Sequence, residues 1–167
     1  KLTAEGRLEE AYEVSSATNN FPEICGRICP QDRLCEGNCV IEKGFESVTI
    51  GSVEKYITET AFDNGWVKPV KPPREREQSV GIIGGGPGGL AAAEQLRKKG
   101  YQVHVYDRYD RMGGLMIYGI PNFKLEKDVV ERRSRLLADG GIHMHHNVEI
   151  GSTVTLDALR QKHDAIL

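Results

Sequence analysis

The chain has 167 residues, of which 39% are apolar and 28% are charged, and its formal net charge is −2. This balance is ordinary for a globular protein and gives no electrostatic basis for binding nucleic acid or a membrane surface. No apolar run approaches the roughly 18 residues that a membrane-spanning helix needs, and residues 1–6 lack the apolar core of a secretory signal. We therefore expect a cytoplasmic protein.

Both ends of the sequence resemble internal positions of a longer chain. It begins at Lys1 and ends at Asp164-Ala165-Ile166-Leu167, a segment that predicts the middle of a buried strand. An unpaired apolar strand is a poor natural terminus because it invites pairing with other chains. We expect a piece of a longer polypeptide, to which the functions predicted below belong.

The first 66 residues predict two helices on either side of a cysteine-rich segment. Apolar residues recur at helical spacing over residues 4–18 and 50–62. Asn19-Asn20 and Asn64-Gly65 follow these helices, and such residues tolerate the left-handed backbone that often ends a helix. Phe21-Pro22 predicts an extended approach to the cysteines.

All four cysteines follow the spacing Cys-x3-Cys-x5-Cys-x3-Cys, as Cys25, Cys29, Cys35 and Cys39. Cysteines that act only as small apolar residues would be scattered, and disulfides belong to oxidising compartments. We therefore predict a metal site. The spacing differs from that of ferredoxins and also suits tetrahedral zinc. A neighbouring flavin domain favours an iron–sulfur cluster, but both metals remain open.

Residues 67–78 contain three prolines and a run of charges, which predict a semi-rigid, solvated linker. Beyond it, strands are predicted at 80–83, 103–106, 142–146 and from 165, with helices at 90–99, 128–139 and 156–162. The first strand, helix and strand form a parallel, right-handed βαβ unit. We therefore expect a helical module over 1–66 and a Rossmann-like α/β domain with a parallel sheet over 79–167.

The loop after the first of these strands carries the pattern Gly84-x-Gly86-x-x-Gly89. These glycines permit a tight turn, close approach of a pyrophosphate and close packing of helix on strand. Asp107 ends the second strand, 18 residues after Gly89, where a carboxylate accepts hydrogen bonds from an adenosine ribose. Arg108 would suit the 2′-phosphate of NADP, whereas a second glycine pair in the loop 110–115 resembles FAD-containing oxidoreductases with two dinucleotide-binding domains, and this resemblance implies FAD.

The tract 143–146 contains three histidines, which we interpret as a strand edge with partly exposed imidazoles and not as a metal site. We expect no catalytic side chain, because hydride transfer to a flavin is the chemistry of the cofactor.

Longer motifs carry a more specific resemblance. Residues 21–66, which open with FPEICGRICPQDR, and residues 112–127, MGGLMIYGIPNFKLEK, resemble the small (β) subunit of bacterial NADPH-dependent glutamate synthase. That family is related to the N-terminal half of dihydropyrimidine dehydrogenase. The resemblance implies that NADPH reduces FAD and that [4Fe–4S] clusters carry electrons to FMN in a large (α) subunit. In that large subunit, L-glutamate is made from 2-oxoglutarate and glutamine-derived ammonia.

The resemblance also implies site residues. Around FAD these are Gly84, Gly86, Gly88 and Gly89 at the pyrophosphate, Asp107 at the ribose, Gly114 and Leu115 in the second loop, Lys124 at the flavin and Ile150 at adenine. The NADPH site would lie outside this chain.

The implied cluster ligands are Cys25, Cys29, Cys35, Cys39 and, at the start of the following helix, Glu54. Cys25 is the weakest candidate because its counterpart in dihydropyrimidine dehydrogenase does not bind iron. The family's upstream cysteine group is absent from the chain, so neither cluster would be complete.

Two alternatives remain open. One is another reductase of the superfamily, such as a ferredoxin:NADP reductase-type or dihydropyrimidine dehydrogenase subunit, which its partner subunit would reveal. The other is a non-enzymatic zinc module on a nucleotide-binding domain. Visible absorbance and acid-labile sulfide separate iron–sulfur from zinc, because zinc gives neither.

Overall fold

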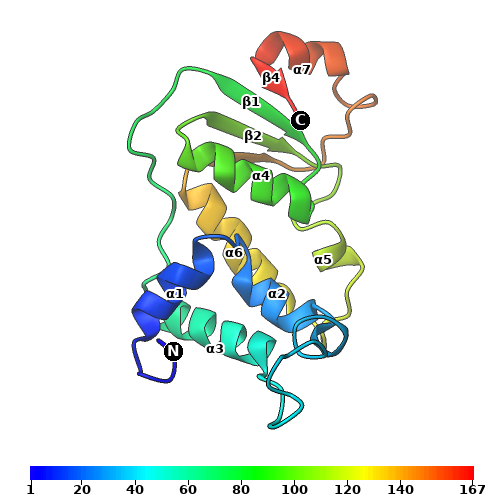
Figure 1. Cartoon of the computed structure of the whole chain (residues 1–167). Coiled ribbons are helices and arrows are strands. Elements are labelled where there is room, and N and C mark those ends of the chain that lie inside the picture. The colour runs from blue at the N-terminus through cyan, green and yellow to red at the C-terminus, as the bar shows by residue number, and fades with distance from the viewer. The chain divides into compact units, whose positions relative to one another are not determined.

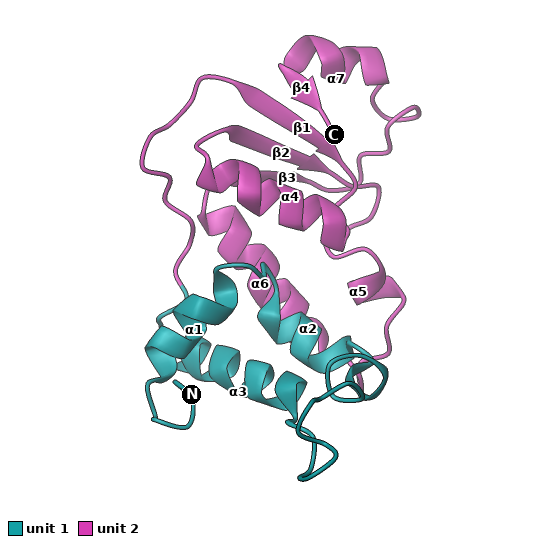
Figure 2. Ribbon diagram, viewed as in Figure 1, with its two compact units in different colours: residues 1–67 teal, residues 68–167 magenta.

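The computed structural model describes residues 1–167 and divides into two compact units, residues 1–67 and 68–167 (Figure 2). Unit 1 is helical, and unit 2 combines a parallel sheet with helices (Figure 1). The predicted fold class, a helical module followed by a Rossmann-like α/β domain, is confirmed. None of the helices has the length and apolar character needed to cross a membrane.

Unit 1 contains three α-helices and one short 3-10 helix. They are α1 (Leu8–Ser16), α2 (Pro22–Ile28), η1 (Gln31–Arg33) and α3 (Ile50–Asp63). Two of them, α1 and α3, lie where the sequence predicts helices, although α1 is shorter than the predicted 4–18. Gly65 has a positive φ of 66° just after α3, as expected for the Asn-Gly end of a helix.

Helix α2 replaces the extended approach that Phe21-Pro22 predicts. Phe21 has a non-helical backbone, and Pro22 is the first helical residue. Proline is favourable at that position because its missing N–H would have no partner within the helix. As a result Cys25 lies on a helix, and Cys29 is the first residue after it.

Glycine allows α2 and α3 to pack closely. A Cβ on Gly26 would lie 2.8 Å from the carbonyl oxygen of Gly51 and 2.9 Å from the backbone nitrogen of Lys55. An ion pair of 3.0 Å between Arg27 and Glu59 also joins the two helices. The first turns of α3 are therefore held against the helix that carries Cys25.

Unit 2 follows the predicted order of strands and helices, with one helix, α5 (Leu115–Tyr118), that was not predicted. Its elements are β1 (Ser79–Ile83), α4 (Pro87–Lys98), β2 (Gln102–Tyr106), α5, α6 (Lys127–Asp139), β3 (Ile142–His145), α7 (Leu156–Lys162) and β4 (Ala165–Ile166). All strands pair in parallel, in the order β3-β2-β1-β4. Because the order reverses at β1, the carboxyl end of β1 lies at the switch point where such sheets bind ligands.

The core of unit 2 forms where helices cover the sheet. Helix α4 packs against β1, β2 and β3, and α6 packs against β3 (Figure 1). Val103 and Val105 of β2 are completely buried, and Leu90 of α4 and Val130 of α6 are each only 1% exposed. Alternation along β2 thus puts valines on the helix-covered face and leaves a polar face opposite.

The second half of the predicted linker is anchored to unit 2. Arg97 donates two hydrogen bonds, of 2.7 and 2.6 Å, to the carboxylate of Glu75. It donates a third, of 2.7 Å, to the carbonyl of Gly140. The backbone N–H of Arg76 donates to the carbonyl of Gly100 at 2.8 Å. Residues 75–76 therefore have fixed partners just before β1.

The polar face of the sheet carries a group of histidines, which we call the histidine cluster: His104, His143, His145 and His163. The rings of His104 and His143 stack with centroids 4.5 Å apart, and a hydrogen bond of 3.0 Å joins His104 Nδ1 to His145 Nε2. His163 Nε2 lies 2.9 Å from the hydroxyl of Tyr106. The tract 143–146 is thus joined to imidazoles from two other segments.

Burial lowers the pKa of His104 to about 4, and the positive potential of the other three cluster imidazoles and of Lys162 acts in the same direction. Burial also lowers the pKa of His145 and of His163. At His104, His145 and His163 the folded protein therefore favours the uncharged imidazole.

We predict that acid weakens the fold through His104. Its folded pKa lies below the ordinary unfolded value of about 6.5, so between about pH 6.5 and 4 the unfolded state binds more protons, and stability falls as pH falls. Thermal unfolding across this range should show a decline that His104→Gln reduces, and the wild-type ring should titrate near pH 4 by NMR. Equal declines in the two proteins would contradict this account.

Candidate functional site

The glycine loop between β1 and α4 leaves open space at a helix N-terminus. Gly84 has φ +105°, which favours glycine, and a Cβ on Gly89 would overlap the carbonyl oxygen of Gly84. A Cβ on Gly86 or Gly88, in contrast, would meet nothing within 4 Å. Gly84 and Gly89 are therefore required by the fold itself. Gly86 and Gly88 border space that an anionic group could fill next to the helix N-terminus.

Asp107 is fixed against this loop at the end of β2. Its side-chain Oδ2 accepts a hydrogen bond of 2.6 Å from the backbone N–H of Gly85, and Oδ1 accepts one of 2.9 Å from the N–H of Tyr109. The residue is only 7% exposed. Each carboxylate oxygen can accept a further hydrogen bond, so the group is held in place and still able to bind a hydroxyl.

A second glycine pair lies directly against the first loop. The N–H of Gly113 donates a hydrogen bond of 2.7 Å to the carbonyl of Gly85. A Cβ on Gly114 would lie 2.9 Å from the Cα of Gly86. Leu115, the first residue of α5, is 72% exposed. The two loops therefore form one continuous backbone surface.

A pocket of about 360 Å³ opens beside Asp107. Its lining consists of Ile83, Gly84, Tyr106, Asp107, Arg108, Tyr109, Val148, Glu149 and Ile150. Ile150, for which the resemblance implies an adenine contact, lines this pocket, whereas Lys124 is exposed and does not. The arrangement of free glycine backbone, fixed carboxylate and adjoining pocket fits a dinucleotide.

Arg108 is engaged at this pocket. Its guanidinium lies over the ring of Tyr109, 4.9 Å from the centroid, and 3.9 Å from the carboxylate of Glu149. Together with Asp107, Glu149 gives the pocket two carboxylates, which would repel a 2′-phosphate. The surroundings of Arg108 therefore favour a ribose with free hydroxyls.

The four cysteines are free thiols, half-buried at Cys25 and Cys39 and exposed at Cys29 and Cys35. The structure does not gather three or more Cys, His, Asp or Glu side chains into an arrangement that could hold an ion. Four unpaired thiols in one small unit are nevertheless a donor set that suits iron or zinc. Such ligands commonly converge only when the metal binds.

Glu54 lies close to Cys25. The side chain of Asn19 connects them, since its Nδ2 donates a hydrogen bond of 2.8 Å to Glu54 and its Oδ1 lies 3.6 Å from the sulfur of Cys25. Burial is the largest cause that raises the pKa of both the Cys25 thiol and the Glu54 carboxyl. The close packing of α2 on α3 thus brings two of the predicted ligands together.

Comparisons with known proteins agree with this organisation. Residues 1–66 match the family described as dihydropyrimidine dehydrogenase domain II, 4Fe-4S cluster, and residues 82–148 match the NAD(P)-binding Rossmann-like domain. Over its whole length the chain is 73% identical to a glutamate synthase [NADPH] small chain of Azospirillum brasilense. Over 99% of its length it is 47% identical to the small chain of Escherichia coli. The predicted resemblance to glutamate synthase small chains is confirmed.

The chain spans 35% of the length of each of these glutamate synthase small chains. It is also 45% identical, over 99% of its length, to a putative oxidoreductase, AegA, of Escherichia coli, of which it spans 25%. Similarity at this level therefore extends beyond glutamate synthases.

Sequence reasoning missed the residues that position the second loop. Lys127, on α6, donates hydrogen bonds to the carbonyls of Met116, at 2.8 Å, and of Ile120, at the end of α5. The hydroxyl of Tyr118 donates to the carboxylate of Asp110. A lysine after a short helix can signal such a cap, but the four-residue α5 is too short to show a helical period.

Proposed function

We propose that the chain is part of an NADPH-dependent flavoprotein oxidoreductase that passes electrons through FAD and [4Fe–4S] clusters to a partner subunit. The observation that carries this proposal is the docking of the second glycine loop on the first, through the hydrogen bond from Gly113 to Gly85. The iron–sulfur family match of residues 1–66 and the dinucleotide-type match of residues 82–148 support it.

We propose FAD, and not NADPH, as the dinucleotide at this site. The second loop places Gly114 close to Gly86, and a nicotinamide site with a single glycine loop would not need this added backbone. The carboxylates of Asp107 and Glu149 disfavour a 2′-phosphate in the adjoining pocket. In this proposal NADPH binds outside the present chain.

The residues of this chain bind and orient the cofactor. The proposed contacts are Gly84, Gly86, Gly88 and Gly89 with the pyrophosphate, Asp107 with the ribose, Ile150 with adenine, Gly114 and Leu115 through the second loop, and Lys124 with the flavin. When bound, FAD supplies the hydride acceptance and single-electron release that side chains cannot provide. The engaged oxygens of Asp107 keep the carboxylate turned toward the loop and not toward solvent.

For the clusters we propose Cys29, Cys35 and Cys39 as ligands, with Cys25 and Glu54 as further candidates. Ligands from outside this chain would complete them. The partner would be the large (α), FMN-containing subunit, and the overall reaction L-glutamate synthesis from glutamine and 2-oxoglutarate. The similarity to AegA favours a second candidate, a reductase of the same superfamily with another electron acceptor.

We predict that Gly86→Val removes FAD from the full-length protein without unfolding it. The new side chain would extend into open space from an ordinary backbone conformation of φ −75° and ψ −177°, where it would meet the pyrophosphate. Flavin per polypeptide, measured by absorbance, should fall to about a tenth or less. This corresponds to a loss of at least ~1.4 kcal/mol in the free energy of FAD binding.

Two matched glycine variants serve as controls. Gly44→Val also points into open space, but in unit 1, and should retain flavin. Gly89→Ala should lower the thermal unfolding midpoint, because its Cβ would overlap the backbone of Gly84 at a cost of ~1–3 kcal/mol. Normal flavin content in Gly86→Val would refute the proposed site.

The cysteine variants test the cluster. After anaerobic purification of the full-length protein, Cys29→Ala, Cys35→Ala and Cys39→Ala should each lose iron and acid-labile sulfide. Cys25→Ala should retain most of both, since the thiol of Cys25 contacts Asn19 and its role as a ligand is the weakest. Stoichiometric zinc with no sulfide in the wild-type protein would overturn the iron–sulfur assignment and favour the zinc alternative.

A further inference from the structure

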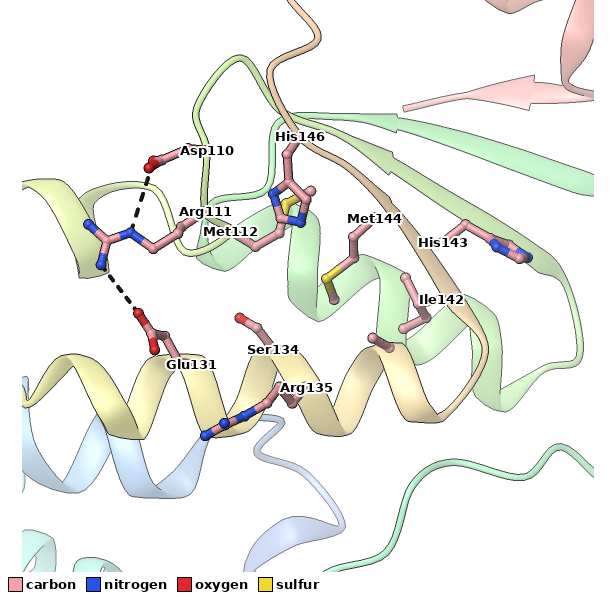
Figure 3. Close-up of a pocket in the computed structure, with 11 residues that line it drawn as sticks. Asp110, Arg111, Met112, Glu131, Ser134, Arg135, Ile142, His143, Met144 and His146 are labelled. Carbon is pink, nitrogen blue, oxygen red and sulfur yellow. Dashed lines mark hydrogen bonds and ion pairs between the residues drawn. The ribbon is translucent and has the colours of Figure 1, made fainter.

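A second cavity, of about 570 Å³, lies in unit 2 between α6 and β3, with residues 110–112 along one side (Figure 3). One face of α6 supplies Glu131, Ser134, Arg135 and Ala138, which are spaced as neighbours on a helix. The cavity shares no lining residue with the pocket beside Asp107. Its volume is within the range of small-molecule sites, and nothing in the proposed electron transfer uses it.

Much of the lining is apolar and adaptable. Met144 extends toward α6, Met112 lies above it beside His146, and Ile142 lies at the other end (Figure 3); Ala138 also lines the cavity. Met112 is only 2% exposed. Thioether side chains are flexible and polarizable, so they adjust to flat apolar groups. The lining therefore suits the body of an aromatic or aliphatic molecule.

The charges of the cavity are divided between two regions. At one end Arg111 lies 3.2 Å from the carboxylate of Glu131 and 4.0 Å from that of Asp110, so that both acids have a cationic partner (Figure 3). Arg135, which lies along α6, has no ion pair or hydrogen bond, whereas the imidazole of His146 borders the cavity on the side of Asp110 (Figure 3). The region near Arg135 therefore carries a cation that an anionic ligand could pair with.

Ser134 adds an unused hydrogen-bonding group. Its hydroxyl points from α6 into the space below the loop 110–112 (Figure 3). The oxygen is buried and has no hydrogen-bond partner. A buried hydroxyl without a partner is costly and rare in folded proteins. A ligand oxygen that accepts from this hydroxyl would remove the penalty.

We propose that this cavity binds a small amphipathic carboxylate. Its apolar body lies against Met112 and Met144, and its carboxylate accepts hydrogen bonds from Ser134 and Arg135. The cavity shares no lining residue with the pocket beside Asp107, so the proposal does not rest on the dinucleotide site, although Met112 also packs against Gly85.

The probe is 2-naphthoate, added to the full-length protein with its cofactors bound, and 2-naphthamide is the uncharged control. Binding is followed by calorimetry and by NMR of ¹³C-methyl-labelled methionines. We expect saturable binding of one naphthoate per chain that shifts the methyls of Met112 and Met144. Met116, which does not line the cavity, should not shift. The amide should bind about tenfold more weakly, because it lacks the charge that pairs with Arg135.

Variants test the contacts. Ala138→Trp should fill the cavity and abolish binding, and Arg135→Gln should weaken it about fivefold. The matched control Arg160→Gln, an exposed arginine on α7, should bind like wild type. Circular dichroism shows whether Ala138→Trp folds. If it does not, the affinity of Arg135→Gln and the methionine methyl shifts decide whether the carboxylate binds in this cavity. No saturable binding, equal binding of acid and amide, or unchanged affinity in Arg135→Gln would overturn the proposal.

Discussion

Both backbone polar groups of Gly85 are hydrogen-bonded, and the candidate dinucleotide site depends on this residue. Its N–H donates to the carboxylate of Asp107 at 2.6 Å, and its carbonyl accepts from the N–H of Gly113 at 2.7 Å. A Cβ at this position would overlap the sulfur of Met112, so any other residue would have to displace that side chain. One residue thereby connects three segments, the first glycine loop, the end of β2 and the second glycine loop. The free backbone around Gly86 is consequently set in place by the protein itself, before any ligand binds.

The two units differ in how far their sites are assembled. In unit 2 backbone hydrogen bonds hold the site, and the parallel sheet positions β1 and β2 so that their carboxyl ends adjoin. In unit 1 only Cys25 and Glu54 are brought close, through Asn19 and the packing of α2 on α3. Large apolar side chains such as Val40 and Phe45 remain exposed in the loop that carries the other cysteines. This difference follows from chemistry, because thiolate ligands are ordered by the metal that they bind.

Sequence reasoning succeeded where a local pattern has one structural outcome. Except for the short α5, the strands and helices of unit 2 follow from periodicity, and the glycine spacing with Asp107 identifies the loop and its carboxylate. Sequence reasoning failed at Pro22, because a proline can either break a helix or begin one. The pairing of His104 with His145, and the cavity beside Ser134, depend on which strand lies next to which. No local pattern contains that information, so these features appear only in the folded chain.

Amide hydrogen exchange in the full-length protein, stripped of flavin and then reconstituted with FAD, tests the central claim most directly. If the two glycine loops form one cradle for a pyrophosphate, adding FAD should slow exchange together in residues 84–90 and 113–116. The α6 segment around Ser134 should stay unchanged. Protection of neither loop on FAD binding, or of the first loop alone, would contradict the account.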